Sequence, residues 1–596
     1  MESNVYELTN AQKSIWNTEL FFNGSNINNI CGTIHLYEPL DFQDLQQALQ
    51  LMINENDNFH SKFVLKDGSV YQSFLDKVDY DVEIVDINTK DDLKKLEDKM
   101  ISRIFDILNS SLFDIKIFRY PDMTGGVVVN IHHLISDSWT LGLIAKNIVN
   151  KYVVVHNKIP NQKNSNSYID YISAEEKYIN SSKFEKDKSF WSEYLANRPD
   201  CISIPSFVDT PAIDATTALK GKRKVFEMNS SLVQEINDFC KIYNVSMYNF
   251  LMAIYSIYIG RINKSDDFIL GTPILNRTSS VQKGTMGMFI NTVPVRIKPT
   301  DKTSFLSFVN NIALDFTSIY RHQKYSYQYI LEDLRKNDPS TPNLYQILLS
   351  YQITKTTTDE GINSSCDWSF NGSIADDMDI HFFDLNNSGN IDIAYDYKIS
   401  KYSEDEIIRI HQRILYMIEQ VLINPGLYIK EISIATMDEL QEILNLAKEN
   451  DCHYPSNKTI SQLFEEQALS TPENVAIKFK NASMTYRELN EKSNQVAHFL
   501  RNLGIKSNDV IGLRLNKSLE MIVGILGILK AGGCYLPIDL SYPQERVSFM
   551  LKDSSAKLFL TNNAHKEDLE IPIDMYLLDI NSKNEIYNIL YNFSKK

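Results

Sequence analysis

Two adjacent histidines and an aspartate four positions after the second of them form the most chemically suggestive group in this sequence of 596 residues. They are His132, His133 and Asp137, within the segment GGVVVNIHHLISDSW. A neutral imidazole accepts a proton near neutral pH, and it can also orient a reacting group by hydrogen bonding. A carboxylate at this spacing either orients a ring or fixes the loop that carries it. The histidine pair therefore suits base-assisted chemistry at one histidine; the alternative is that both are strand-end histidines whose hydrogen bonds are only structural.

The residues around this group predict a strand before it and a helix after it. Val127–Ile131 is mostly β-branched and apolar, as in a strand that is buried on both faces. Successive side chains of a strand point to opposite faces, so if the strand continues through both histidines, at most one of them can face a given cavity. Ser136 or Asp137 suits the N-cap of a helix from Ser138 to about Tyr152. A base at this junction lies beside amide groups that can stabilise an oxyanion.

The remainder of the first 435 residues mixes strand and helix patterns. Ser231 and Gln234 have the spacing of a capping box at the start of a helix. A hairpin is expected near residues 387–397. Apolar periodicity predicts helices over 41–55, 91–107, 230–262 and 404–422, and strands over 82–85 and 126–131. A polar linker is expected at 436–458, followed by strands at 474–479, 510–515 and 557–561 in a βαβ pattern.

Composition excludes several classes of protein. The net charge of −16 does not suit a phosphate-backbone partner, so no nucleic-acid binding is expected. The longest apolar run, near 521–529, is too short for a membrane span, and residues 1–9 lack the features of a secretory signal. The six cysteines contain no CxxC pair, so neither a metal site nor a disulfide framework is predicted. We expect a cytoplasmic monomer.

The histidine segment is the third in a series of motifs. HHxxxDxW at 132–139 is similar to the signature of condensation domains of nonribosomal peptide synthetases, most of which read HHxxxDG. Further segments resemble other motifs of that family in the same order: LTNAQKSIW at 8–16, YIDY at 168–171, GMFINTVPVR at 287–296, HQKYSY at 322–327 and residues 344–352. The first 435 residues are therefore identified as a member of that family.

This resemblance implies an α/β fold with two lobes of the chloramphenicol-acetyltransferase type, arranged as a V with a tunnel between them. The lobes are expected at 1–175 and 176–435. In the family, a thioester donor and an amine acceptor enter from opposite faces on phosphopantetheine-type arms, and an amide bond forms. The catalytic histidines of the motif are His133, which lies near the reacting atoms, and its neighbour His132. The resemblance implies no covalently bound cofactor.

The resemblance also implies a structural role for Asp137. In the family this aspartate pairs with an arginine of an LRTxF-like segment, which here reads NFHSKF at 58–63 and has His60 at the arginine position. Three possibilities follow: His60 replaces the arginine, Lys62 replaces it, or Asp137 pairs elsewhere. We expect the structural residues of the site to include Asp137, Trp139, His60, Arg277 and Asn291.

Details of the motifs resemble one branch of the family. LTNAQKSIWNTELFFNGSNINNI, FEKDKSFW and RHQKYSY are similar to starter condensation domains of lipopeptide synthetases, and the first motif begins by Leu8, which leaves no room for an upstream docking helix. Such domains transfer a fatty acyl group from acyl-coenzyme A to an aminoacyl group on the phosphopantetheine arm of a downstream peptidyl carrier protein. The alternatives are ordinary peptide condensation with a separate donor carrier protein, and a non-catalytic domain that recruits carrier proteins.

Residues 459–596 resemble the N-terminal part of an adenylation domain. LKAGGCYLPIDLSYPQERVSFMLKDSSA at 529–556 is similar to the second core motif of that family. Gly532 and Gly533 suit a tight turn between helix and strand, because no GxxxxGK[ST] phosphate loop follows them. The ATP loop and the catalytic lysine of the family are not in this sequence. We therefore expect a truncated α/β subdomain that does not adenylate.

Overall fold

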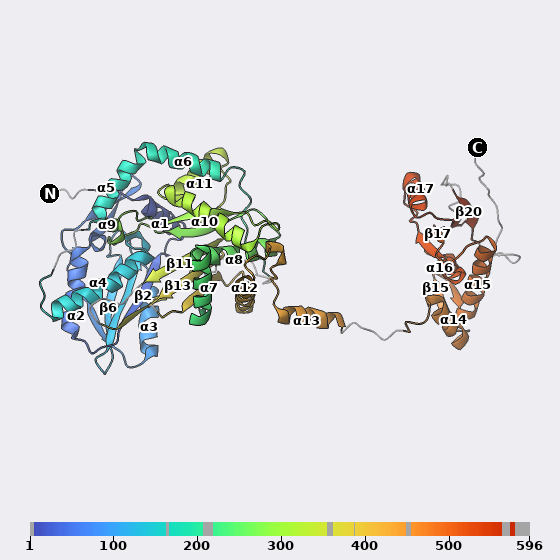
Figure 1. Ribbon diagram of the computed structural model, residues 1–596, viewed down its shortest axis with the longest axis horizontal. Helices are drawn as coiled ribbons and strands as arrows, with labels where there is room; N and C mark the ends of the chain where they lie inside the picture. The colour runs from blue at the N-terminus through green and yellow to red at the C-terminus, as the bar shows by residue number, and fades with distance from the viewer. Residues whose placement is uncertain are drawn as a thin grey trace. The chain divides into compact units, whose positions relative to one another are not determined.

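The computed structural model divides into two compact units, Met1–Leu444 and Asn445–Lys596, each of which is described by itself (Figure 1). None of the described helices is long and apolar enough to cross a membrane. The residues that the structure describes are 5–161, 166–206, 218–354, 362–386, 388–448, 455–562 and 573–578.

The first lobe of the first unit is built on a five-stranded sheet. Its strands, in spatial order, are β12 (Ser364–Ser369), β2 (Asn29–Leu36), β7 (Gly125–His132), β6 (Phe113–Arg119) and β5 (Glu83–Asp86). Helices α2 (Phe42–Glu55) and α4 (Ser138–His156) pack on one face, and α3 (Lys90–Ile101) packs on the other. All eight residues of β7 are buried, as expected of a strand covered on both faces.

The second lobe has a six-stranded mixed sheet. Its strands are β10 (Asn291–Ile297), β9 (Phe268–Ile274), β11 (Ile347–Thr354), β13 (Met378–Leu385), β14 (Ile391–Lys398) and β8 (Gly221–Met228). Its core is shared with α7 (Ser230–Tyr243), α8 (Met247–Asn263), α10 (Phe305–Arg321) and α12 (Glu404–Ile423). The two-lobed α/β fold is confirmed, and β13 and β14 form the predicted hairpin; residue 387 lies outside the described residues.

Smaller elements complete this unit around the two lobes. A three-stranded sheet has the order β1 (Tyr6–Glu7), β4 (Ser69–Phe74) and β3 (Ser61–Lys66). The remaining helices are α1 (Asn10–Phe21), α5 (Tyr168–Ile179), α6 (Ser182–Tyr194), α9 (Ser280–Lys283) and α11 (Tyr327–Asn337).

Two predicted helix boundaries were wrong. The apolar pattern over 230–262 is divided into α7 and α8, because Asn244 adopts a left-handed conformation with φ of 53° that ends α7. The N-cap of α7 is Asn229, whose side chain accepts from the amide of Leu232, so Ser231 and Gln234 form no capping box. The helix predicted over 91–107 ends at Ile101.

Strand β12 crosses from the later half of the chain into the sheet of the first lobe. It pairs antiparallel with β2, from Ser364 opposite Leu36 to Ser369 opposite Cys31. The sequence assigned all residues of 176–435 to the second lobe, so this crossing was not anticipated. Side chains just beyond β12 strengthen it: Asn371 Nδ2 donates to the carbonyl oxygens of Ile27 (2.9 Å) and Asn29 (3.0 Å).

Because β12 pairs with β2, we expect position 32 in β2 to accept no side chain larger than that of glycine. A Cβ atom at this position would lie 2.4 Å from Cζ3 of Trp368 in β12. We expect Gly32→Ala to lower the free energy of unfolding by about 1–3 kcal/mol, because the indole has to move. Tryptophan fluorescence during urea unfolding measures this, since all four tryptophans of the chain belong to the first unit. Combining Gly32→Ala with Trp368→Leu is expected to cost less than the sum of the two single changes; strict additivity would contradict the steric explanation.

The second unit has the predicted βαβ pattern. Its parallel sheet has the order β18 (Cys534–Pro537), β17 (Val510–Leu513), β19 (Leu558–Thr561) and β20 (Asp574–Leu577). A hairpin of β15 (Val475–Phe479) and β16 (Ala482–Thr485) precedes it, and the helices are α14 (Ile460–Ser470), α15 (Tyr486–Asn502), α16 (Leu519–Ala531) and α17 (Gln544–Asp553). In the segment 436–458, expected to be a linker, the described part includes the helix α13 (Met437–Lys448).

Candidate active site between the two lobes

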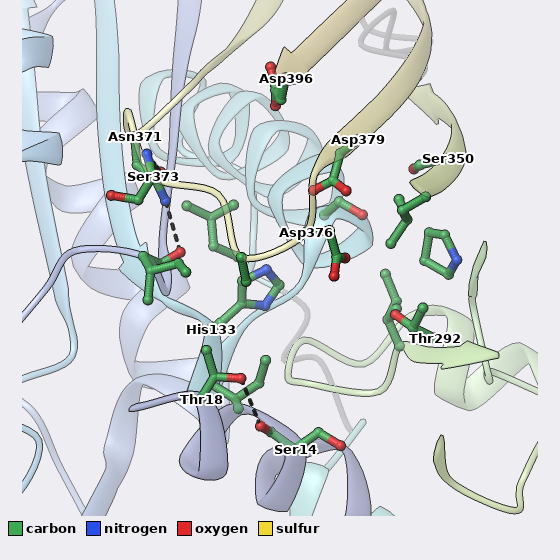
Figure 2. Close-up of a pocket in the computed structure, with 18 of the residues that line it drawn as sticks. Ser14, Thr18, His133, Thr292, Ser350, Asn371, Ser373, Asp376, Asp379 and Asp396 are labelled. Carbon is green, nitrogen blue, oxygen red and sulfur yellow. Dashed lines mark hydrogen bonds between the residues drawn. The ribbon is translucent and has the colours of Figure 1, made fainter. Parts of the chain in front are cut away.

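A cavity of about 1010 Å³ is lined by both lobes of the first unit, and His133 is part of its wall (Figure 2). Ligand pockets commonly have volumes of about 300–1,000 Å³, so this cavity can enclose a sizeable substrate. The first lobe contributes residues of α1, β2 and the start of α4, and the second contributes residues of β10, β11 and β13. Lining residues from these elements include Ser14, Thr18, Ser138, Leu141, Thr292 and Ser350.

The imidazole of His133 is fixed by the turn that follows β7. The backbone amide of His133 donates to the carbonyl oxygen of Asn28 (2.8 Å), and its ring Nδ1 lies 3.0 Å from the carbonyl oxygen of Ser136. A carbonyl oxygen can only accept, so Nδ1 carries the proton and Nε2 keeps its lone pair. Burial lowers the pKa of His133 to about 4, although the nearby charge of Asp137 opposes this shift. At neutral pH the ring is therefore an uncharged acceptor in the cavity wall.

His132 has different surroundings and is not among the residues that line the cavity. Its Nδ1 accepts a hydrogen bond from the amide of Leu134 (3.1 Å), and its Nε2 lies 3.4 Å from Oε2 of Glu19. The ring meets Phe105 edge-on, with 6.1 Å between the ring centroids. The strand ends at His132, and His133 begins the short 3₁₀ turn His133–Ile135, so the two rings lie in different surroundings. The contacts of His132 suit the fixing of the turn and of α1 rather than contact with a substrate.

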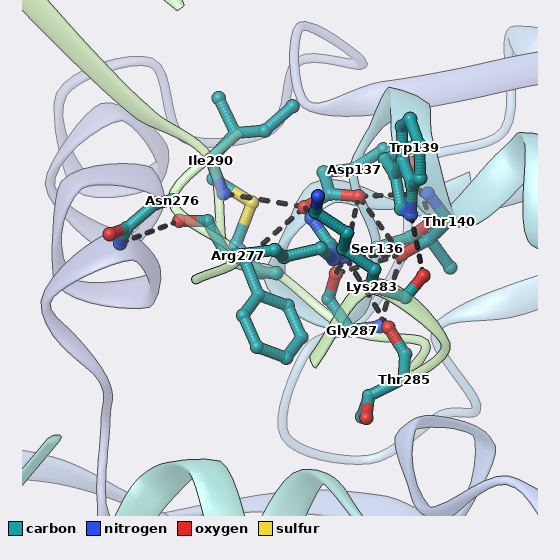
Figure 3. A network of polar contacts seen from close by, with 12 residues as sticks. Ser136, Asp137, Trp139, Thr140, Asn276, Arg277, Lys283, Thr285, Gly287 and Ile290 are labelled. Atoms are coloured by element: carbon teal, nitrogen blue, oxygen red, sulfur yellow. Dashed lines mark hydrogen bonds and ion pairs between the residues drawn. The ribbon is translucent and has the colours of Figure 1, made fainter. Parts of the chain in front are cut away.

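Asp137 is enclosed in a network of donors that joins the two lobes (Figure 3). Its carboxylate pairs with Arg277 at 2.7 Å (Nη1 to Oδ2) and 3.1 Å (Nη2 to Oδ1). The amide and the hydroxyl of Thr140 both donate to Oδ1 at 2.9 Å, which makes Asp137 the N-cap of α4. The amides of Phe289 (3.0 Å) and Ile290 (3.3 Å) donate to Oδ2.

The negative charge of Asp137 is balanced by the positive charge of Arg277 in the interior of the protein. Neither side chain of the Asp137–Arg277 pair is exposed to solvent. Burial by itself would raise the pKa of Asp137, but the charge of Arg277 and the converging hydrogen bonds hold that pKa below its ordinary value. The guanidinium also lies 4.0 Å from the ring centroid of Phe289. Asp137 and Arg277 therefore fix the position of the loop that carries His133.

Two other predicted residues also hold connections near the cavity. Trp139 Nε1 donates to the carbonyl oxygen of Lys283 (2.8 Å), which ties the first turn of α4 to α9 in the other lobe. Asn291 Nδ2 donates to the carbonyl oxygens of Gln323 (2.9 Å) and Tyr325 (3.1 Å) and so fixes the start of β10.

His60 is not the partner of Asp137. Its two ring nitrogens face the carbonyl oxygens of Leu75 (2.8 Å) and Ile53 (3.0 Å), so it connects its own turn to α2 and to the end of β4. Of the three possibilities that the sequence left open, the structure shows that Asp137 pairs elsewhere, with Arg277.

The arrangement agrees with the comparison of the sequence with protein families. Residues 2–444 match the family model described as "Condensation domain". The chain belongs to the condensation-domain family. Residues 464–589 match a second family model, "AMP-binding enzyme", so the chain has the domain order of a nonribosomal peptide synthetase: a condensation domain followed by the N-terminal part of an adenylation domain.

Curated relatives of this condensation domain are much longer proteins. Surfactin synthase subunit 1 of Bacillus subtilis (strain 168) is 29% identical over 611 residues, which cover 99% of this chain and 17% of that protein. One plipastatin synthase subunit of the same organism is 30% identical over 568 residues, which cover 94% of this chain and 22% of that protein. The chain thus spans about a fifth of the length of these two relatives.

Solved structures show the same fold. A four-domain nonribosomal peptide synthetase bound to AMP and glycine has a TM-score of 0.72 at 19% identity, covering 97% of this chain and 45% of that one. The starter condensation domain of rhizomide synthetase, in complex with C8-CoA and Leu-SNAC, has a TM-score of 0.65 at 17% identity, covering 72% of this chain and 98% of that one.

The neutral His133 of this condensation domain predicts a particular pH dependence. Because burial lowers its pKa to about 4, the unprotonated form dominates above that pH, and protonation of this ring should have little effect on a reaction between pH 5 and 7. Any loss of rate there is expected to follow other groups, chiefly the acceptor amine, whose unperturbed pKa is about 7.7–8.0. Single-turnover rates measured from pH 5 to 9 should have the same profile shape in the wild type and in His133→Gln. An inflection near pH 6.5 that His133→Gln removes would contradict a neutral His133.

Sequence reasoning missed one feature of the cavity wall. Asp376 and Asp379 line the cavity together with His133 (Figure 2). Neither belongs to a motif with recognisable spacing, and they lie more than 200 residues after the histidine in the sequence. They reach the site because residues of both lobes line the same cavity in the folded chain.

Proposed function

We propose that this chain catalyses the transfer of a fatty acyl group from acyl-coenzyme A to the amine of an aminoacyl group on a carrier protein. The observation that carries the proposal is the neutral His133, held by Ser136 on the wall of a cavity that both lobes line. The amine attacks the thioester carbonyl, a C–N bond forms, the C–S bond breaks, and coenzyme A leaves as the thiol.

The residues of the site have separate roles in this reaction. Nε2 of His133 orients the amine and accepts its proton, an effect worth about 10²- to 10⁴-fold in rate. Holding donor and acceptor together in the cavity contributes about 7–11 kcal/mol through proximity. Asp137 and Arg277 position the loop and do not touch the reactants. The described residues that line the cavity all belong to the first unit.

Two observations support coenzyme A as the donor carrier. The segments at 8–30, 184–191 and 321–327 resemble starter condensation domains. A solved starter condensation domain with this fold holds C8-CoA and Leu-SNAC, and it matches 72% of this chain. The acceptor would be held on the phosphopantetheine arm of a peptidyl carrier protein. We further propose that the chain acts as a cytoplasmic monomer.

Ordinary condensation, with a donor delivered by a second carrier protein, is the alternative. The first condensation domain of the calcium-dependent antibiotic synthetase, solved with a substrate analogue, has the same fold with a TM-score of 0.63. The two functions take their acyl group from different donors, so donor choice separates them.

A donor comparison tests the proposal. The purified chain is incubated with an aminoacyl carrier protein and, in separate reactions, with acyl-coenzyme A of graded chain length or with the same acyl groups on a carrier protein. Intact-protein mass spectrometry then follows the acceptor. We expect a mass gain of one acyl group from coenzyme A donors. Product from carrier-bound donors alone would establish ordinary condensation, and product from neither would favour a domain that only recruits carrier proteins.

A further inference from the structure

Two carboxylates in the cavity wall have no part in the reaction described above. Asp379 is the second residue of β13, and Asp376 lies just before that strand. The neighbours of Asp379 in the strand, Met378 and Ile380, are fully buried in the core of the second lobe, so alternation directs Asp379 toward the cavity. Figure 2 shows both carboxylates beside the cavity that His133 lines, and Asp376 is the nearer to the ring in this view.

The cations near these carboxylates are engaged with other acids. Arg223 makes a two-pronged pair with Asp396, at 2.7 Å and 2.8 Å. Lys398 and Lys401 both pair with Asp377, the residue that separates Asp376 from the start of β13. Among the described residues no cation forms an ion pair with Asp376 or Asp379.

Asp379 is also short of hydrogen-bond donors. Its Oδ1 is shielded from solvent and has no hydrogen-bond partner among the described residues. A buried carboxylate oxygen without a donor is costly, and a cation beside it would remove that cost. Burial raises the pKa of Asp376 to about 7 and that of Asp379 well above its ordinary value, and the charge of Lys398 opposes both shifts without cancelling them.

We propose that Asp376 and Asp379 together bind a primary ammonium group of the acceptor substrate. The proposal rests on the proposed function, which places an aminoacyl group in this cavity. An ammonium group has three donors on a compact charge, so it can serve two carboxylates at once. The described residues include no group of three or more His, Cys, Asp or Glu placed to hold a metal ion, which makes a metal the poorer fit.

Two sources of the ammonium share this chemistry. One is the α-ammonium of the acceptor before it loses its proton and attacks. The other is the side chain of a basic amino acid such as lysine or ornithine. In the first case the two aspartates act on every acceptor, and in the second they select basic ones.

A binding experiment separates these sources and does not depend on turnover. Four C6 acyl groups are attached to pantetheine through an amide in place of the thioester: hexanoyl, norleucyl, 6-aminohexanoyl and lysyl. They carry no ammonium, the α-ammonium only, the terminal ammonium only, and both. Calorimetric titration of the full chain without donor gives their dissociation constants. Asp376→Asn/Asp379→Asn is the test variant, and Asp392→Asn, an exposed acid on the adjacent strand β14 that does not line the cavity, is the control.

We expect at least one ammonium to tighten binding by about 10- to 100-fold over hexanoyl in the wild type. The double variant should lose that gain while binding hexanoyl unchanged, and Asp392→Asn should keep it. The ammonium whose gain disappears identifies the source. Equal binding of all four probes by the wild type, or a gain that survives in the double variant, would overturn the proposal. Since no acyl transfer is measured, failure of the proposed function alone would leave these dissociation constants unchanged.

Discussion

Replacing His133 by alanine is expected to slow amide formation by a factor of about 10² to 10⁴, the usual contribution of a positioned general base. Nδ1 of the neutral ring is hydrogen-bonded to the carbonyl oxygen of Ser136, so Nε2 is the nitrogen that can accept a proton from the attacking amine. Single-turnover rates with a saturating donor measure the effect on the chemical step. The affinity for the acyl donor should change little, since the cavity has many other lining residues.

Two matched variants make this prediction specific. His133→Gln keeps a donor for the Ser136 carbonyl but replaces the basic nitrogen, so we expect it to be nearly as slow as His133→Ala. His132→Gln removes a side chain that does not line the cavity, and its main effect should be on stability. A His133→Gln enzyme close to wild-type rate would mean that the ring only positions the turn.

Replacing Asp137 by asparagine is expected to lower the free energy of unfolding of the first unit by about 3–5 kcal/mol, as is typical when one partner of a buried ion pair is lost. Asparagine is similar in shape and can still cap α4, but it leaves the charge of Arg277 buried without a counter-charge. Tryptophan fluorescence during urea unfolding measures the loss, because the tryptophans all belong to the first unit.

A second substitution tests the reason for this loss. Asp137→Asn combined with Arg277→Met removes both charges, so we expect the double variant to be more stable than Asp137→Asn alone. A double variant less stable than either single one would show that packing, rather than the unpaired charge, dominates. At the other predicted partner, His60→Gln should leave the Asp137–Arg277 pair intact, since His60 bonds only to backbone carbonyls.

Local sequence patterns were sufficient for the strand before His133 and for the helix after it. The alternation expected of a continued strand does not separate the two histidines, because β7 ends at His132 and His133 lies in the following turn. A β-branched run predicted β7, and a capping residue predicted the start of α4. These features depend on residues close together in the chain. The choice between Ser136 and Asp137 as the N-cap needed the structure, because both side chains suit that position.

Contacts between residues far apart in the chain could not be predicted from the sequence. Arg277 was expected among the structural residues of the site, but its pairing with Asp137, 140 residues away, was not, because nothing in their local patterns identifies the two as partners. The pairing of β12 with β2 joins segments more than 300 residues apart, and the short strand has no pattern that identifies its partner. For the same reason Asp376 and Asp379 could not be assigned to the cavity.

Amide formation at His133 can be tested by comparing the wild-type chain with His133→Ala in a single assay. An aminoacyl carrier protein is offered both coenzyme A and carrier-bound acyl donors, and intact-protein mass spectrometry follows the acceptor at equal times in the two reactions. We expect one added acyl group in the wild-type reaction and little or none with the variant within the same period. Equal product from both proteins, or no product from the wild type with either donor, would show that His133 does not have this role.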